Sequence, residues 1–180
     1  ANLPWFSFCQ RQSRYAEGIE MLAAAFEMVS NQPQSPDRDK IRAELLTGRG
    51  WLEMRLGHLE EASTAFETAC ALYASGKFTP KPAMGSDPRT GLPLLAVIRG
   101  DYDVALDLAN QAWEAAAARQ DRPNLTIAGY GLTSAAIAQG RLDVALQFAR
   151  ETLGLTKLVG SRWMMAYIYN HLGEITQGLA

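Results

Sequence analysis

The 180-residue chain holds two histidines and two cysteines, the side chains most often found at metal sites and as nucleophiles. Neither His58 nor His171 has a cysteine or carboxylate at the spacing of a metal-binding motif, and neither an HExxH nor a CxxC pattern occurs. We therefore expect no metal site. Both imidazoles are expected to be solvated or to cap a helix.

Cysteine catalysis requires a thiolate that a neighbouring base activates, and the sequence places no such base beside Cys9 or Cys70. Cys70 follows Ala69 in an apolar helical stripe, so we expect a buried thiol there. Cys9, near the N-terminal end, is expected to be more exposed. Two cysteines are too few for a disulfide-framed secreted domain, which favours a reducing cytoplasm.

Two glycine-containing segments superficially resemble nucleotide-binding loops. The segment 76–77 lacks both the glycine at position 71 and the preceding strand of a phosphate loop, and 129–131 lacks a third glycine. The acidic pairs at 60–61 and 101–103 begin helices, where carboxylates cap the helix and complement its dipole. These residues predict no catalytic centre and no cofactor, so the chain is not expected to be an enzyme.

The charge composition argues against a surface built to hold nucleic acid. Seventeen basic and nineteen acidic side chains leave a formal net charge of −2. No apolar run reaches the roughly 18 residues of a membrane span, and the N-terminal segment lacks the pattern of a secretory leader. We expect a cytoplasmic chain that contacts neither nucleic acid nor membrane directly.

An internal repeat organises the sequence. The segments 57–62, 100–105 and 140–145 share a glycine, a polar residue, Leu or Tyr, two mostly polar residues and an alanine, and 13–18 is a weaker copy. The copies start 44, 43 and 40 residues apart. In each copy the glycine is expected to end one helix and the next residues to begin an antiparallel one, with the alanine at the helix contact. One such pair cannot bury its apolar face alone, so neighbouring pairs must stack.

Apolar periodicity predicts two helices in each repeat. The first helices are expected at 41–54 (opened by Ser35-Pro36-Asp37), after Asp87-Pro88, at 125–139 and at 162–179; the second helices at 15–29, 59–74, 102–119 and 142–159; and a short helix at 4–11. Pro93 should kink or delay the helix of the third repeat. No segment alternates with period two, so the sequence predicts nine helices and no sheet.

The pattern Gly-x-Tyr/Leu-x-x-Ala, followed four residues on by Phe or Ala and preceded by small residues such as Gly50 and Gly173, resembles the tetratricopeptide repeat (TPR). The period exceeds the standard 34 residues. This longer variant resembles the helical-repeat region of large bacterial signalling proteins, such as MalT-like transcription regulators or nucleotide cyclases built around a STAND-type ATPase. The segments 46–62 and 87–105 carry most of the likeness.

The resemblance implies an all-α fold, a right-handed superhelical α-solenoid of about four and a half antiparallel helix pairs. It spans nearly the whole chain as a single domain. The repeats are expected at about 1–34, 35–86, 87–121, 122–160 and, incomplete, 161–180.

In this repeat family the first helix of each pair lines the concave face, which implies a partner-binding groove. Carried over residue by residue, the groove comprises Glu44, Thr47, Trp51, Met54, Arg55, Leu94, Val97, Ile98, Ile127, Tyr130, Ser134, Ile137, Tyr167, Asn170 and Glu174. Large amphipathic aromatics such as Trp51, Tyr130 and Tyr167 suit a binding surface. The alternative is that these rings fill space between neighbouring repeats.

The expected function is protein–protein interaction, as a scaffold or sensory module of a larger bacterial signalling or transcriptional regulator that binds a peptide or protein in the groove. The alternative is a small-molecule inducer-sensing arm of a MalT-like regulator, which a closed, aromatic-lined cavity would favour. The chain lacks an initiator methionine and ends within a repeat, so we expect a fragment of a longer protein. It is expected to expose apolar surface around 163–165 and to self-associate through this C-terminal end.

Overall fold

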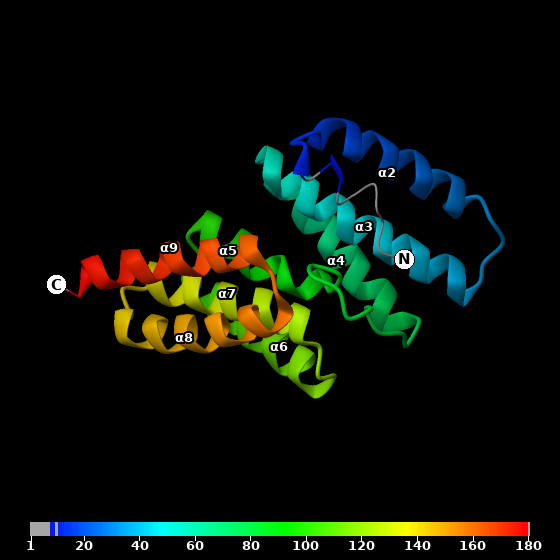
Figure 1. Ribbon diagram of the computed structural model, residues 1–180. Helices are drawn as coiled ribbons and strands as arrows, with labels where there is room; N and C mark the ends of the chain where they lie inside the picture. The colour runs from blue at the N-terminus through cyan, green and yellow to red at the C-terminus, as the bar shows by residue number, and fades with distance from the viewer. Residues whose placement is uncertain (1–7, 10, 180) are drawn as a thin grey trace. The chain divides into compact units, whose positions relative to one another are not determined.

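The computed structural model describes residues 8–9 and 11–179. Within these residues the chain forms eight α-helices, labelled α2 to α9, and one 3-10 helix, η1, with no strand (Figure 1). The predicted all-α class is therefore confirmed for the described part of the chain. No helix there is both long enough and apolar enough to cross a bilayer.

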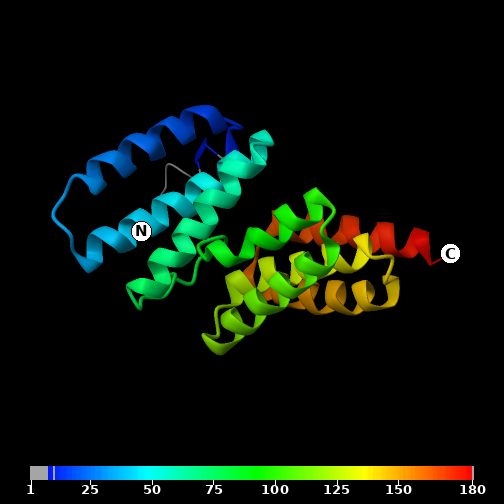
Figure 2. The ribbon, with the colours of Figure 1, turned by 180° about the vertical axis from the view of Figure 1, so that it is seen from behind.

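The described chain divides into two compact units. Unit 1 extends to Lys81 and includes Ser86–Gly91, and unit 2 comprises Pro82–Gly85 and the residues from Leu92 onward. Unit 1 contains α2 (Tyr15–Ser30), α3 (Pro36–Leu56), α4 (Leu59–Ser75) and η1 (Pro88–Thr90). Unit 2 contains α5 (Leu92–Arg99), α6 (Tyr102–Ala118), α7 (Arg122–Ala138), α8 (Leu142–Val159) and α9 (Arg162–Gly178). Figure 2 shows the helices of each unit from behind.

The second helices of the predicted pairs match α2, α4, α6 and α8 to within one residue at each end. Two of the first helices, α3 and α7, begin earlier than their apolar pattern indicated, because polar caps extend them. The Ser35 hydroxyl accepts a hydrogen bond from the Arg38 N–H at 3.1 Å, and the Asp121 carboxylate accepts one from the Asn124 N–H at 3.2 Å. The helix expected at 4–11 falls largely outside the described residues; Phe8, Cys9 and Arg11 are helical.

The third repeat has a divided first helix, as the proline pattern predicted. η1 ends at Thr90, and α5 begins only at Leu92, which places Pro93 at its second position. Proline lacks an N–H donor and fits only in the first turn of a helix. Pro93 therefore delays the helix to this point, and α5 is only 8 residues long.

The turns of the repeat have the expected backbone geometry. The three repeat glycines adopt the left-handed conformation, with φ of 80°, 88° and 72° at Gly57, Gly100 and Gly140. Ser13, which replaces the glycine in the weaker copy, adopts the same conformation with φ of 54°. The alanines five residues after the glycines are fully buried: Ala62, Ala105 and Ala145. The repeat motif thus marks where one helix ends and where the next packs.

Small residues in unit 1 make room for one large ring. Phe66 of α4 is fully buried. A Cβ atom added to Gly50 of α3 would lie 2.7 Å from its ring, and one added to Gly91 would overlap it. Both glycines are therefore required for Phe66 to reach the core.

Unit 2 is packed mainly through alanine. Ala96, Ala105 and Ala135 form a buried cluster, against which Leu106 and Leu108 pack. Because alanine side chains are short, the backbones of neighbouring helices in unit 2 can approach each other closely.

Candidate functional site

Unit 1 buries two of its predicted groove residues. Trp51 is only 7% exposed and packs edge-to-face on Phe66, with ring centroids 5.3 Å apart and an interplanar angle of 75°. Thr47 is also buried, and its hydroxyl donates a hydrogen bond to the Ala43 carbonyl oxygen at 2.7 Å. Both side chains face the interior of unit 1, which corresponds to the space-filling alternative for Trp51.

The other predicted groove residues of unit 1 lie nearer its surface. Glu44 is half-buried and forms an ion pair with the Lys81 ammonium at 3.2 Å. Met54 is half-buried and Arg55 is exposed. Because Trp51 is buried, the surface of α3 that remains from the predicted groove consists of Glu44, Met54 and Arg55, without an aromatic ring among them.

The aliphatic groove residues of unit 2 are divided between core and surface. Ile127 is 3% exposed, and Val97 packs against the buried alanine cluster. Leu94 and Ile137 are half-buried, whereas Ile98 is 56% exposed. The surface that remains is carried mainly by α7 and α9.

Four rings from α7 and α9 form the most concentrated candidate site, which we call the aromatic cluster: Tyr130, Trp163, Tyr167 and His171. Tyr167 makes edge-to-face contacts with Trp163 and with Tyr130, both with ring centroids 5.7 Å apart. Tyr130 in turn stacks on His171, with centroids 4.7 Å apart and planes 3° from parallel. The structure therefore brings together the predicted pair Tyr130 and Tyr167.

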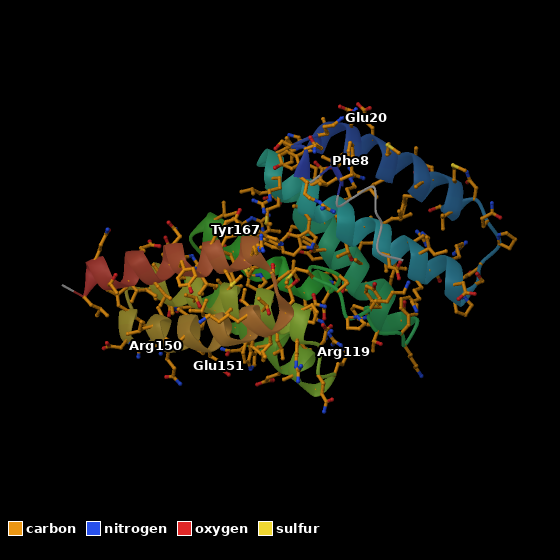
Figure 3. The ribbon with its side chains drawn as sticks, in the orientation of Figure 1. Phe8, Glu20, Arg119, Arg150, Glu151 and Tyr167 are labelled. Atoms are coloured by element: carbon orange, nitrogen blue, oxygen red, sulfur yellow. The ribbon has the colours of Figure 1, made fainter. Side chains whose placement is uncertain are left out.

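The spacing of residues on α9 explains why part of the cluster is exposed. Trp163, Tyr167, Asn170 and Glu174 recur at helical spacing, and all four are exposed. The neighbouring stripe turns inward and is buried: Met164, Ile168, His171 and Ile175. In Figure 3, Tyr167 on α9 lies at the edge of unit 2 opposite to Arg150 and Glu151 of α8.

Trp163 was not among the predicted groove residues, although it lies in the segment 163–165 that was expected to expose apolar surface. Trp163 is 46% exposed and Tyr167 is 38% exposed. The sequence signal that could have identified Trp163 was its spacing of four residues from Tyr167, which places both aromatics on one face of the helix. Ser134 donates a hydrogen bond from its hydroxyl to the Tyr130 carbonyl oxygen at 2.9 Å, which ties it to the cluster's own helix.

His171 is the inner member of the cluster, and the expectation that it would be solvated or capping is wrong. The side chain is 8% exposed, and Nδ1 has no hydrogen-bond partner among the described residues. Burial lowers the pKa of the imidazole, against a smaller opposing effect of Glu174. His171 therefore acts as a neutral, flat support beneath Tyr130. Its helical spacing from Ile168 and Ile175 indicated this burial.

The other histidine and the two cysteines differ in how far their side chains are exposed to solvent. His58 is exposed, as predicted, and its Nδ1 lies 2.8 Å from the buried Glu53 carboxylate. Cys9 is fully buried and Cys70 is half-buried, so the expectation that Cys9 would be the more exposed thiol is wrong. Cys9 packs under Gly18, whose missing side chain leaves space for the thiol. Burial, with a smaller effect of Asp87, raises the pKa of Cys70 to about 11, which makes this thiol a poor nucleophile.

No metal-binding group of three or more His, Cys, Asp or Glu side chains occurs in the described part of the chain. An open hollow of 460 Å³ lies at the helix turns of unit 2, lined by Gly100, Tyr102, Asp103, Gln139 and Arg141. The Gln139 amide donates to the Asp103 carboxylate at 2.7 Å across it. This hollow shares no residue with the aromatic cluster and is not the closed aromatic cavity that would favour a small-molecule sensor.

Comparison with known proteins identifies the fold. No protein-family model matches the chain, and no curated protein matches it. Among solved structures, it is similar to a Podosopora anserina protein named for kinesin light chain and built of nearly identical TPR-like repeats, and to a single-substitution variant of that protein. Each comparison has a TM-score of 0.63 at 16% sequence identity and covers 97% of this chain and 86% of the other. The chain therefore has the fold of TPR-like repeats, an α-solenoid class.

Proposed function

We propose that the chain is a non-catalytic protein-interaction module that binds a peptide or protein segment on the aromatic cluster of α7 and α9. TPR-like repeats generally mediate protein–protein interaction. The proposal depends chiefly on one observation, the contiguous rings of Trp163, Tyr167 and Tyr130, of which the first two are substantially exposed. Exposed large aromatics that lie together are typical of interaction surfaces.

The rings are held in place before any partner arrives. Tyr167 is in contact with a ring on each side, and Tyr130 rests on the buried His171. Side chains that are already ordered lose little rotational entropy on binding, so more of the contact energy contributes to affinity. The cluster therefore meets the main requirement of an anchor site for a partner side chain.

Polar groups beside the rings suit a peptide more than a purely apolar ligand. Asn170 and Glu174 follow Tyr167 on the exposed face of α9. An amide and a carboxylate at the edge of an aromatic surface can hydrogen-bond to a peptide backbone and set its orientation. We infer that the partner lays apolar side chains on the rings and directs polar groups toward these two residues.

Selection from a phage-displayed peptide library on the immobilised chain would test this function. A selected peptide, labelled with fluorescein, is then titrated with the wild-type chain and with Trp163→Ala and Tyr167→Ala while anisotropy is recorded. Each substitution removes a contact ring, and we expect each to weaken binding by about tenfold or more. Circular dichroism checks that both variants stay helical.

Tyr169→Ala is the matched control, because Tyr169 is a tyrosine of the same helix, 54% exposed, on a different face. It should leave the affinity of a cluster-binding peptide unchanged. If the selected peptides bind the Trp163→Ala and Tyr167→Ala chains as tightly as the wild type, the aromatic cluster is not the binding site and the proposal is wrong.

The wider context remains a prediction from sequence. Membership of a larger bacterial regulator rests on the resemblance of the repeat pattern, and the inducer-sensing alternative rests on the same resemblance. Self-association through the C-terminal end also stays a prediction. Light scattering that finds a monomer at every concentration would contradict it.

A further inference from the structure

One face of α2 in unit 1 exposes long apolar side chains to solvent. Met21 is 47% exposed and Met28 is 71% exposed, and their spacing of seven residues places them on one side of the helix. Glu20 and Glu27 form a parallel exposed row, and Ala24 lies between the two rows. We call the surface of these five residues the outer face of α2. In Figure 3, Glu20 lies on the side of α2 that faces away from α3.

In α4, the next second helix of unit 1, the equivalent positions are covered by another helix. Counted from the start of each repeat motif, Met21 corresponds to Ala65, and Met28 to Leu72. Ala65 is buried in a cluster with residues of α3, the first helix of its own pair, and Leu72 packs against that cluster. These positions of a second helix therefore contact a helix in α4 and are open in α2.

The helix α6 of unit 2 shows the same use of these positions. Leu108 and Ala115 occupy them, and both are half-buried. Leu108 packs against a cluster that contains Ala96 of α5, the first helix of its pair. In each unit, therefore, apolar residues at this spacing serve as a contact surface for a helix.

The charges of the outer face of α2 specify which kind of helix fits it. The sequence of α2 contains neither lysine nor arginine. Glu17 pairs with Arg14, but Glu20 and Glu27 form no ion pair with any residue that the structure describes. Two unneutralised carboxylates beside an apolar row attract a basic partner, and they repel an acidic one or a second copy of the same face.

We propose that the outer face of α2 binds a basic amphipathic helix of a partner protein. The apolar residues of that helix would contact the two methionines, whose flexible thioether side chains adapt to the shape of a partner. Its lysine or arginine side chains would pair with Glu20 and Glu27. This surface belongs to unit 1 and shares no residue with the aromatic cluster, so the proposal stands independently of the proposed peptide-binding function.

A synthetic peptide of about 20 residues, with leucine at helical spacing on one face and lysine at the adjoining positions, is the probe. The fluorescein-labelled peptide is titrated with the full chain while anisotropy is recorded. A peptide with the same leucines, and with glutamate in place of every lysine, is the control for charge. We expect the lysine peptide to bind about tenfold or more tightly than the glutamate peptide, and its affinity to fall as salt is added.

The double variant Met21→Gln and Met28→Gln tests the apolar row. Glutamine has a similar length and helix propensity, so the helix should stay intact while its apolar contacts are lost. We expect the lysine peptide to bind this variant about tenfold or more weakly. Leu158→Gln is the matched control, because Leu158 of α8 is also 71% exposed, and it should leave the affinity unchanged.

The double variant Glu20→Lys and Glu27→Lys tests the acidic row. It should weaken binding of the lysine peptide by about tenfold or more and strengthen binding of the glutamate peptide. Asp107→Lys with Glu114→Lys is the matched control, since it changes the net charge by the same amount. These two exposed acids hold the same positions in α6, where the adjoining apolar residues are half-buried, so the control should change the affinity little.

Circular dichroism checks that every variant stays helical, and four results would then overturn the proposal. Failure of the lysine peptide to bind the wild-type chain would show that the face does not accept a basic helix. Equal affinity for the wild type and the glutamine double variant would mean that the peptide binds elsewhere. An equal loss with the lysine double variant of α6 would indicate general attraction between charges. A loss with Tyr167→Ala would place the peptide on the aromatic cluster.

Discussion

Trp51 of α3 and Tyr167 of α9 are large aromatics on first helices of the repeat, yet they have opposite environments. Trp51 is 7% exposed and its ring contacts the buried Phe66. Tyr167 is 38% exposed and its ring contacts Trp163 and Tyr130. The first is part of the core of unit 1, and the second belongs to the surface of unit 2.

The difference arises from the residues around each aromatic, and not from the aromatic itself. Gly50 and Gly91 admit the Phe66 ring beneath Trp51, which completes a tight cluster. Tyr167 packs edge-to-face against Trp163 of its own helix and Tyr130 of α7, and 38% of its side chain stays exposed. An aromatic on a first helix therefore indicates a binding surface only when its neighbours leave one face open.

Replacement of the two rings by alanine should give the largest contrast. Trp51→Ala leaves a cavity over Phe66 and should lower the free energy of unfolding by about 3–5 kcal/mol. Tyr167→Ala removes a partly exposed side chain and should lower it by less than about 1 kcal/mol. Urea unfolding followed by circular dichroism measures both, and similar losses for the two variants would contradict the assignment of Tyr167 to the surface.

Alanine at the two equivalent glycines should sharpen the same contrast. At Gly50 the new methyl group would lie within 2.7 Å of the Phe66 ring, so Gly50→Ala should destabilise unit 1 by about 1–2 kcal/mol despite the better helix propensity of alanine. Gly173→Ala meets no obstacle and should stabilise the chain by up to about 1 kcal/mol. Thermal unfolding of the two variants should shift in opposite directions; a gain in stability for Gly50→Ala would show that the Phe66 ring is not tightly held.

The pH dependence of stability should reveal the buried support of the aromatic cluster, with a smaller effect. Because burial lowers the pKa of His171, the unfolded chain takes up a proton at higher pH than the folded chain does. The contribution of the neutral His171 to the free energy of unfolding is fully present above the ordinary histidine pKa of about 6.5. It is lost as the pH falls below that value. His171→Phe keeps an aromatic ring against Tyr130 and removes this titration.

Chemical unfolding of the wild type and His171→Phe between pH 7.5 and 5.5 tests this point, since the variant retains His58 as its only imidazole. The wild type should lose more stability on acidification than the variant. Parallel pH profiles would mean that His171 is not buried as a neutral ring.

Much of the fold could be predicted from local signals. The repeat glycines predicted the left-handed turns, and the alanines predicted the helix contacts. Pro93 predicted the late start of α5. The candidate site was predicted less well. Tyr130 and Tyr167 were predicted as groove residues and do contact each other, but Trp163 was left out, and His171 was expected to be solvated or to cap a helix.

Helix bounds and turns follow from interactions among residues close in sequence: a hydroxyl that caps an N–H, a glycine that accepts a positive φ, a proline that lacks a donor. These interactions depend only on local sequence, and they were sufficient to predict the antiparallel helices. Whether a given ring becomes core or surface depends on a helix that arrives from elsewhere in the chain, as α4 brings Phe66 to Trp51. Burial therefore depends on contacts between helices that are distant in sequence. The exposed fractions of Trp51, Tyr167 and His171 were decided only by the packing of those helices.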